Sequence, residues 1–265
     1  MSTIVILGLI IFIIAVIMTM AGRGGGNFYV LILVLTGIPI HEAATTGQFI
    51  LFTAAIAGML VFQKNKIIAW PLVFLIGILV AFAALAGGYF SHRFSGFTLK
   101  IVFSCMLAVA GFLMLIPVSE SKTKSPGKRF GYWQYHSGDE LHSVNLWIAL
   151  PVAVAAGFGA GMVGVSGGSF LVPLMVLACS VPMHVAVGTA STLVAVSAFM
   201  GFIGHAMKGD FNPAWAIPLA VVTIIGGVVG GKWALRAKPK YLKQLFAYTN
   251  LAAALVMIIN AYYSR

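Results

Sequence analysis

Charge is scarce in this sequence, and negative charge is the scarcest. Charged residues make up 8% of the 265 positions, with five Asp or Glu against 16 Lys or Arg. Hydrophobic residues make up 61%, and the mean hydropathy is +1.04. Because a soluble domain carries about 25% charged and about 45–50% apolar residues, this composition excludes a soluble fold. It indicates an integral membrane protein.

Cysteine is almost absent as well. Cys105 and Cys179 both lie inside apolar runs, which excludes a disulfide framework, and no Cys or His spacing suggests zinc. No nucleophile, base and orienting group occur together, so we expect neither an enzyme nor a metal or cofactor site. The net charge is +11. We do not expect the protein to bind nucleic acid, because its basic residues can orient it in the membrane and contact anionic lipid.

Long apolar runs occupy the rest of the chain. Runs of roughly 18 to 22 residues are long enough for a helix across about 30 Å of hydrocarbon. Two shorter runs would each span only about 20 Å as a helix. All are apolar on every face, which argues against membrane strands with alternating polarity. We predict an all-α membrane protein of ten segments: long ones at 3–20, 43–62, 67–88, 99–116, 144–164, 185–204, 213–231 and 242–261, and short ones at 27–40 and 169–181.

The two halves of the sequence match one another around glycine clusters. Residues Gly22, Gly25, Gly26, Phe28 and Val30 recur 142 positions later as Gly164, Gly167, Gly168, Phe170 and Val172. After a one-residue insertion, IPIHEAATTGQ lies over VPMHVAVGTAS. Such self-similarity predicts a duplicated unit of five segments, residues 1–116 and 144–265, joined by a polar connecting loop at 117–143.

The placement of basic residues predicts how many segments cross the membrane. Cytoplasmic loops collect Lys and Arg. If all five segments of each half cross, 12 basic residues fall on one side and four on the other, whereas two re-entrant short segments would give eight and eight. We therefore predict ten crossings, an inverted second repeat, outside termini and a cytoplasmic connecting loop.

Short segments interrupted by glycine at matching positions of inverted repeats indicate a transporter site near the membrane midplane. A helix broken there would present free backbone N–H groups and a positive helix end, which suit an anion. For Arg23, anchoring at the cytoplasmic surface is an equal alternative, and for the glycines close helix packing is another. The candidate binding residues at the breaks are Arg23, Gly24, Gly25, Gly26, Asn27, Ser166, Gly167, Gly168 and Ser169.

Polar residues at the start of the following helices extend this candidate site. His41 and His184 occupy equivalent positions, for which helix capping is the alternative. Glu42 is the one carboxylate near a repeat motif, so Glu42 and His41 are the proton-coupling candidates, with a helix-dipole role as the alternative. His205, at a helix end, is expected to be interfacial. The remaining candidate binding residues are Thr46, Gln48, Thr189 and Ser191.

The stretch GVSGGSFLVPLMVL and its partner GRGGGNFYVLILVL resemble the repeated glycine-rich signature of the sulfite exporter TauE/SafE family. This resemblance implies a secondary transporter in the cytoplasmic membrane for sulfite, sulfoacetate or a related sulfonate. A passive anion channel would use the same glycine-lined amides and is the alternative. The first copy departs from the signature, because Leu31 stands opposite Pro173 and Arg23 opposite Val165.

The charge asymmetry generates a test of topology. In protein lacking Cys105 and Cys179, a cysteine introduced at Ser125 should react with an impermeant thiol reagent only from the cytoplasmic side. One introduced at Ser2 should react only from outside. Labelling of both from the same face would instead support an even number of crossings per half.

Overall fold

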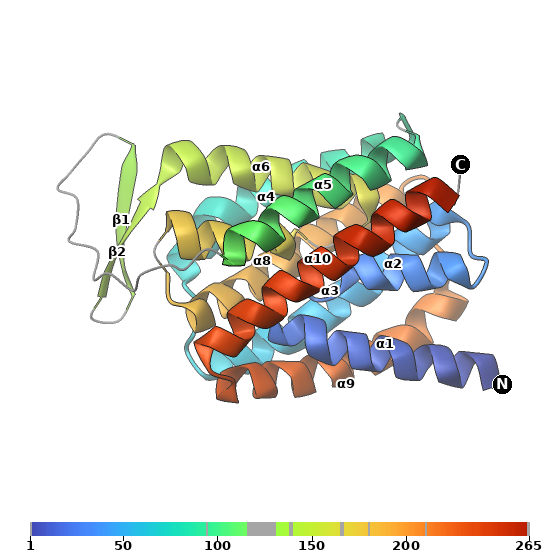
Figure 1. Ribbon diagram of the computed structural model, residues 1–265, viewed down its shortest axis with the longest axis horizontal. Coiled ribbons are helices and arrows are strands. Elements are labelled where there is room, and N and C mark those ends of the chain that lie inside the picture. The colour runs from blue at the N-terminus through green and yellow to red at the C-terminus, as the bar shows by residue number, and fades with distance from the viewer. Residues whose placement is uncertain are drawn as a thin grey trace.

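The computed structural model describes residues 2–93, 95–115, 131–137, 140–164, 167–179, 181–209 and 211–263. They form a bundle of helices along the long axis of the molecule, with a small hairpin at one end (Figure 1). The first half contains α1 (Ser2–Met20), α2 (Gly26–Leu35), α3 (Ile40–Lys64), α4 (Trp70–Phe90), the 3-10 turn η1 (Ser91–Arg93) and α5 (Gly96–Leu115). The second contains α6 (Leu146–Val163), α7 (Gly168–Pro173), the π-helical turn η2 (Leu174–Ala178), α8 (Met183–Ala206), α9 (Pro213–Arg236) and α10 (Pro239–Tyr263).

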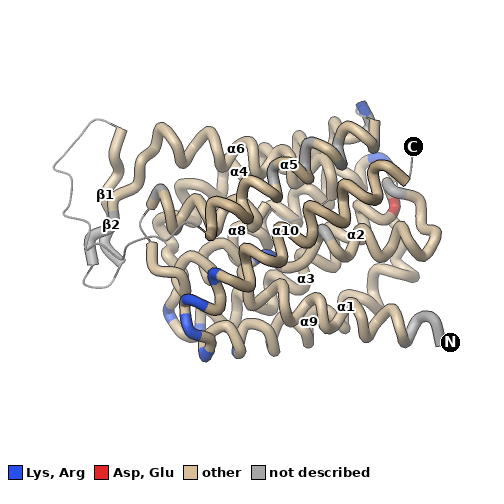
Figure 2. Tube along the Cα trace, viewed as in Figure 1, with Lys and Arg blue, Asp and Glu red and all other residues tan. Residues whose placement is uncertain are grey.

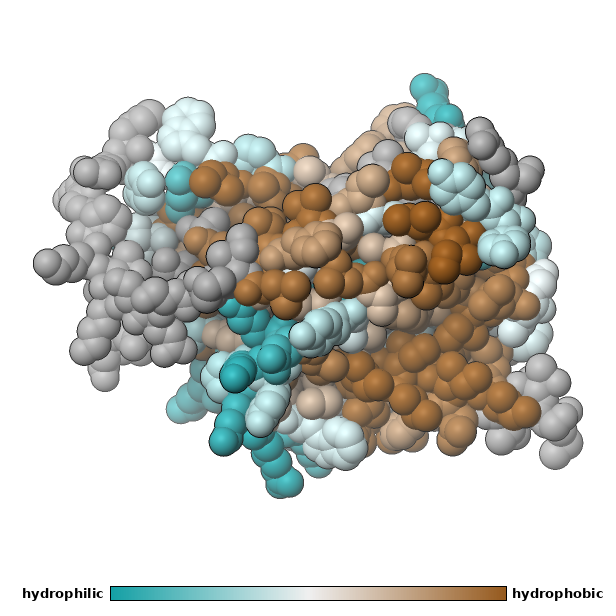
Figure 3. Space-filling model, in the orientation of Figure 1, coloured by the Kyte–Doolittle hydropathy of each residue, from teal (hydrophilic) through white to brown (hydrophobic). Residues whose placement is uncertain are grey.

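The prediction of an all-helical membrane protein with ten helical segments is confirmed. Six helices in the described ranges are long and apolar enough to cross a membrane: α3, α4, α6, α8, α9 and α10. Apolar side chains cover much of the visible bundle surface, whereas hydrophilic ones gather toward the hairpin end (Figure 3). This outer surface matches the hydrocarbon of a bilayer.

The two chain ends lie together at the end of the bundle opposite the hairpin (Figure 1). Most of the described Lys and Arg residues cluster at the hairpin end (Figure 2). This arrangement agrees with an odd number of segments in each half. The assignment of the hairpin end to the cytoplasm remains a prediction.

Part of the stretch predicted as a connecting loop is a β-hairpin. Strand β1 (Tyr132–Ser137) pairs antiparallel with β2 (Glu140–Asn145). Tyr132 lies opposite Asn145, where the Asn145 side chain accepts a hydrogen bond from the Trp147 amide and caps α6. The predicted connecting loop therefore contains a hairpin that the sequence analysis did not anticipate, while 116–130 lie outside the described ranges.

Glycines allow several helices to approach one another closely. A Cβ at Gly157 of α6 would lie 2.8 Å from the carbonyl oxygen of Val80 in α4, and one at Gly87 of α4 would collide with the carbonyl of Phe158. Gly230 of α9 meets the carbonyl of Val16 in α1 in the same way. Small residues at such crossings are the usual basis of helix packing in membranes.

The main helix contacts have matching partners in the two halves. Helix α3 packs on α9 and α4 packs on α8, while α1 packs on α9 and α6 on α4. If a two-fold axis relates the halves, each contact should recur with both helices replaced by their equivalents in the other half. The pairs α3–α9 and α8–α4, and the pairs α1–α9 and α6–α4, recur in this way. The inverted repeat itself remains a prediction that this contact pattern supports.

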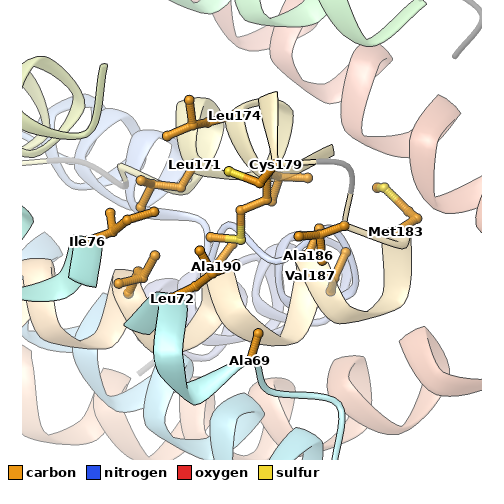
Figure 4. Close-up of a cluster of buried hydrophobic side chains, with 14 of the residues drawn as sticks. Ala69, Leu72, Ile76, Leu171, Leu174, Cys179, Met183, Ala186, Val187 and Ala190 are labelled. Carbon is orange, nitrogen blue, oxygen red and sulfur yellow. The ribbon is translucent and has the colours of Figure 1, made fainter. Parts of the chain in front are cut away.

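A buried apolar cluster fixes the α7–η2 segment against α4 and α8. Leu171 points toward Leu72 and Ile76 of α4 (Figure 4), and Leu174 of η2 and Ala190 of α8 belong to the same buried cluster. Pro173 has no N–H to donate and closes α7, and the chain continues as the π-helical turn η2. The cluster thereby holds in place the segment that begins with the second glycine cluster.

The close approach of α4 and α6 can be tested with a matched pair of glycine substitutions. Gly157→Ala places a methyl group 2.8 Å from the Val80 carbonyl oxygen and should cost about 1–3 kcal/mol. Gly8→Ala in α1 is the control, because its Cβ would lie 3.8 Å from Val222 Cγ2. Thermal unfolding in detergent should show a lower midpoint for Gly157→Ala only. Equal midpoints would show that the Gly157 contact does not limit packing.

Candidate functional site

Two glycine-rich connections lie between consecutive helices at the positions matched in the sequence, and we call them the glycine turns. The first, residues 21–25, joins α1 to α2, and the second lies between the end of α6 and the start of α7. Gly22 and Gly164 have φ angles of 73° and 74°, a left-handed conformation in which side chains are disfavoured. A Cβ at Gly22 would lie 2.9 Å from the Val187 carbonyl oxygen, and one at Gly164 would lie 2.7 Å from Ala44 Cα. Val187 and Ala44 are themselves equivalent positions in the sequence repeat.

The two turns meet at Gly168. A Cβ there would lie 2.8 Å from the Gly22 carbonyl oxygen and 3.0 Å from Arg23 Cα. Real Cβ atoms do not make contacts this short with backbone, so glycine at position 168 is required for the turns to touch. Ser166, a predicted binding residue on the second turn, lies outside the described residues.

Arg23 projects from the first turn into the protein interior. Its side chain is 1% exposed, so it does not serve as a surface anchor. Its Nε donates to Ser169 Oγ and its Nη1 donates to Thr249 Oγ1, both at 3.0 Å. The guanidinium carbon lies 5.5 Å from the centre of the Phe246 ring. Among the described residues these recorded partners are two hydroxyls and an aromatic ring, and none is a carboxylate.

The Arg23 contacts connect three elements that are far apart in sequence. Ser169 comes from α7 and is fully buried, whereas Thr249 and Phe246 come from one face of α10. The Thr249 hydroxyl donates to the Leu245 carbonyl at 2.7 Å, which leaves its oxygen lone pairs for the guanidinium. Arg23 therefore joins the first half of the chain to two elements of the second.

Sequence reasoning missed the contribution of α10. The signal available was the adjacent polar pair Thr249 and Asn250 inside an otherwise apolar run. Neither residue has a counterpart in the glycine clusters, so comparison of the two repeats could not reveal it.

The other predicted residues of the first turn follow Arg23 directly in the sequence. Gly25 precedes α2 in a left-handed conformation with φ of 92°, and no side chain caps that helix in the described structure. The amides of the first turn of α2, which includes Gly26 and Asn27, belong to the groups that intrahelical bonding leaves unused. A Cβ at Gly24 would collide with Leu51 of α3. Gly167 precedes α7 in the corresponding place.

Three predicted binding residues hold neighbouring elements in place. A ring nitrogen of His184 is 2.9 Å from the Ala237 carbonyl oxygen at the end of α9. Thr189 accepts a hydrogen bond from the Ala69 amide at 3.0 Å, and Gln48 donates to the Ala160 carbonyl at 3.2 Å. Contact of these residues with a solute remains a prediction.

The remaining predicted residues lie along α3 and α8. Thr46 is fully buried, and its hydroxyl has no recorded partner in the described structure. Ser191 faces Gly58, where a Cβ would lie 3.3 Å from its hydroxyl oxygen. His41 and Glu42 are half-buried in the first turn of α3, and their role in proton coupling remains a prediction.

His205 corrects one sequence-based expectation. Instead of facing the membrane interface, its side chain is 1% exposed, and its Nε2 lies 2.8 Å from the Gly161 carbonyl oxygen near the end of α6. The described ranges contain no group of three or more His, Cys, Asp or Glu residues able to hold a metal ion.

Comparison with known proteins identifies the family. The model of the family "Sulfite exporter TauE/SafE" matches residues 7–257. The chain is 26% identical over 238 residues to the probable membrane transporter protein YunE of Bacillus subtilis, covering 85% of each chain. It is 23% identical over 255 residues to the probable membrane transporter protein YdhB of the same organism, covering 94% of this chain and 98% of YdhB.

A probable membrane transporter protein of Xylella fastidiosa (strain Temecula1) is 24% identical over 255 residues, with 91% of this chain and 90% of that protein covered. No solved structure matches the chain at a significant level. The family and these relatives are membrane transporters and not enzymes. A family match over nearly the whole chain and a bundle of membrane-length helices lead to one conclusion: this multi-pass membrane protein belongs to the TauE/SafE family of sulfite exporters.

Proposed function

We propose that the protein is a secondary transporter of a small sulfur-containing anion and that Arg23 holds this anion where the two glycine turns meet. The observation that carries the proposal is the buried guanidinium of Arg23, whose recorded partners in the described structure include no carboxylate. The family description, sulfite exporter, supports sulfur as the central atom of the anion.

The charge of Arg23 is the physical reason to expect an anion. An arginine at the membrane centre costs about 3 kcal/mol or more. Ser169, Thr249 and the Phe246 ring orient and partly stabilise the guanidinium, but they carry no negative charge. An oxyanion would neutralise it, and the planar fork of N–H donors matches sulfonate oxygens as it matches phosphate.

The origin of the contacts supports a carrier in preference to a channel. Arg23 belongs to the first half of the chain, and its partners Ser169 and Thr249 belong to the second. In inverted-repeat transporters, substrates bind at broken helices between two such units, and access alternates as one unit moves against the other. In this proposal the hairpin end faces the cytoplasm, and Glu42 with His41 is the expected proton-coupling pair.

Substitution of Arg23 tests the proposed site. Arg23→Gln should weaken binding of sulfite or sulfoacetate by about 10- to 150-fold, the effect of losing a charge-assisted hydrogen bond worth about 1.5–3 kcal/mol. Arg23→Lys should restore only part of the affinity, because an ammonium keeps the charge and loses the fork. Isothermal titration of purified protein measures both, and equal affinities in all three proteins would refute the binding role.

Arg93→Gln is the matched control for this experiment. Arg93 also lies over a phenylalanine ring, with its guanidinium carbon 5.4 Å from the centre of Phe90, but its side chain is exposed. Its substitution should leave anion affinity unchanged. Thermal unfolding without ligand should accompany each titration, so that loss of fold is distinguished from loss of the site.

A flux experiment distinguishes the carrier from a passive anion channel. Protein reconstituted in vesicles loaded with unlabelled sulfite should accumulate external labelled sulfite transiently against its gradient, because a carrier exchanges one anion for another. Uptake should saturate with concentration. Conductance that rises without saturation and shows no counterflow would establish the channel instead.

A further inference from the structure

Asn250 of α10 is a buried amide without a partner. Its side chain is 0% exposed, and neither Oδ1 nor Nδ2 has a hydrogen-bond partner in the part of the chain that the structure describes. Each unpaired buried polar group costs about 1–3 kcal/mol. The Asn250 amide therefore lowers the stability of the folded protein when no ligand is bound.

Three other asparagines have an evident structural role. Asn145 and Asn212 accept hydrogen bonds from backbone amides and cap α6 and α9. Asn65 donates to the Val61 carbonyl at 2.8 Å at the end of α3. Asn250 instead lies in the interior of its helix, and the buried residues three or four positions away are Phe246, Ala247, Ala253 and Ala254.

The position of Asn250 connects it to the Arg23 site. It directly follows Thr249, which accepts a hydrogen bond from Arg23, and it lies four residues after Phe246, whose ring lies beside the guanidinium. On a helix, residues three and four apart are neighbours, with about 5–6 Å between their Cβ atoms. The unpaired amide therefore lies one helical turn from Phe246 on the same face of α10, and it is adjacent to Thr249 along the chain. Helix α10 crosses the bundle beside α5 (Figure 1).

We propose that Asn250 is a specificity-determining residue that binds a hydroxyl group on the transported anion while Arg23 binds its anionic oxygens. This inference rests on the proposed function of Arg23. A hydroxyl group both donates and accepts a hydrogen bond, so it satisfies the acceptor Oδ1 and the donor Nδ2 together. An ammonium satisfies Oδ1 alone, and a methyl group leaves both atoms unpaired. The predicted preference is for small hydroxy-substituted sulfonates.

Three sulfonates of similar size test this preference: 2-hydroxyethanesulfonate, 2-aminoethanesulfonate and 1-propanesulfonate, which end in hydroxyl, ammonium and methyl groups. Each carries an anionic sulfonate group for Arg23, and the ammonium leaves 2-aminoethanesulfonate with no net charge. Titration of the wild-type protein should show the hydroxyl compound binding at least 10-fold more tightly than the other two. In Asn250→Leu, a substitution of similar volume, affinity for the hydroxyl compound should fall about 10-fold and the preference should disappear.

Thermal unfolding without ligand separates binding from folding. Asn250→Leu removes two unpaired polar atoms and should be as stable as the wild type or more stable, while it loses the preference. Thr223→Val is the control, because Thr223 is also fully buried but bonds to the Ile50 carbonyl in the α3–α9 contact. It should lower stability and leave the order of the three anions unchanged.

The same titrations distinguish failure of this inference from failure of the proposed function. If Arg23→Gln loses affinity for all three anions while Asn250→Leu keeps the wild-type affinities and order, the role of Asn250 is refuted and that of Arg23 stands. If Arg23→Gln binds all three as the wild type does, both proposals fail. A wild type that does not distinguish the three anions also refutes the role of Asn250.

Discussion

The burial of one positive charge in an apolar bundle is the constraint on which the candidate site depends. Hydrocarbon cannot solvate a guanidinium, so Arg23 must find its partners inside the protein. It finds hydroxyls on α7 and α10 and the face of Phe246. These contacts bring a turn of the first half, the start of α7 and the middle of α10 to one place.

Glycine makes this meeting possible through backbone geometry. The contact of Gly168 with Gly22 and Arg23 leaves no room for a Cβ, and the left-handed conformations of Gly22 and Gly164 disfavour one. The glycine pairs of the packed helices work differently, because there the chain stays helical and only the approach of a neighbouring backbone excludes a side chain. Close packing, one of the two explanations considered for glycine from the sequence, therefore applies at the helix crossings, while anion binding at the glycine clusters stays a prediction.

The helical architecture could be predicted from the sequence because a membrane-spanning helix requires one continuous apolar stretch. Such a stretch is visible in the sequence without knowledge of tertiary contacts. Runs such as 213–231 and 242–261 correspond to α9 and α10, and the actual helices extend beyond the runs to include polar residues such as Lys232 and Lys240. The hairpin was missed because its strands are short and lie in a polar stretch. For the site, the repeat identified Arg23 and Ser169. It could not identify Thr249 or Asn250, because their proximity depends on how α10 crosses the bundle.

The charge of Arg23, which has no carboxylate among its recorded partners in the described ranges, also bears on how membrane voltage acts on the proposed carrier. If Arg23 stays in place and a monoanion crosses without the proton expected from Glu42 and His41, each cycle moves one net negative charge. Moving one elementary charge through 100 mV is worth about 2.3 kcal/mol. A voltage that is negative inside would then sustain an outward concentration ratio of about 50-fold for that anion without any coupled ion. The resting cell would thus drive export and oppose entry.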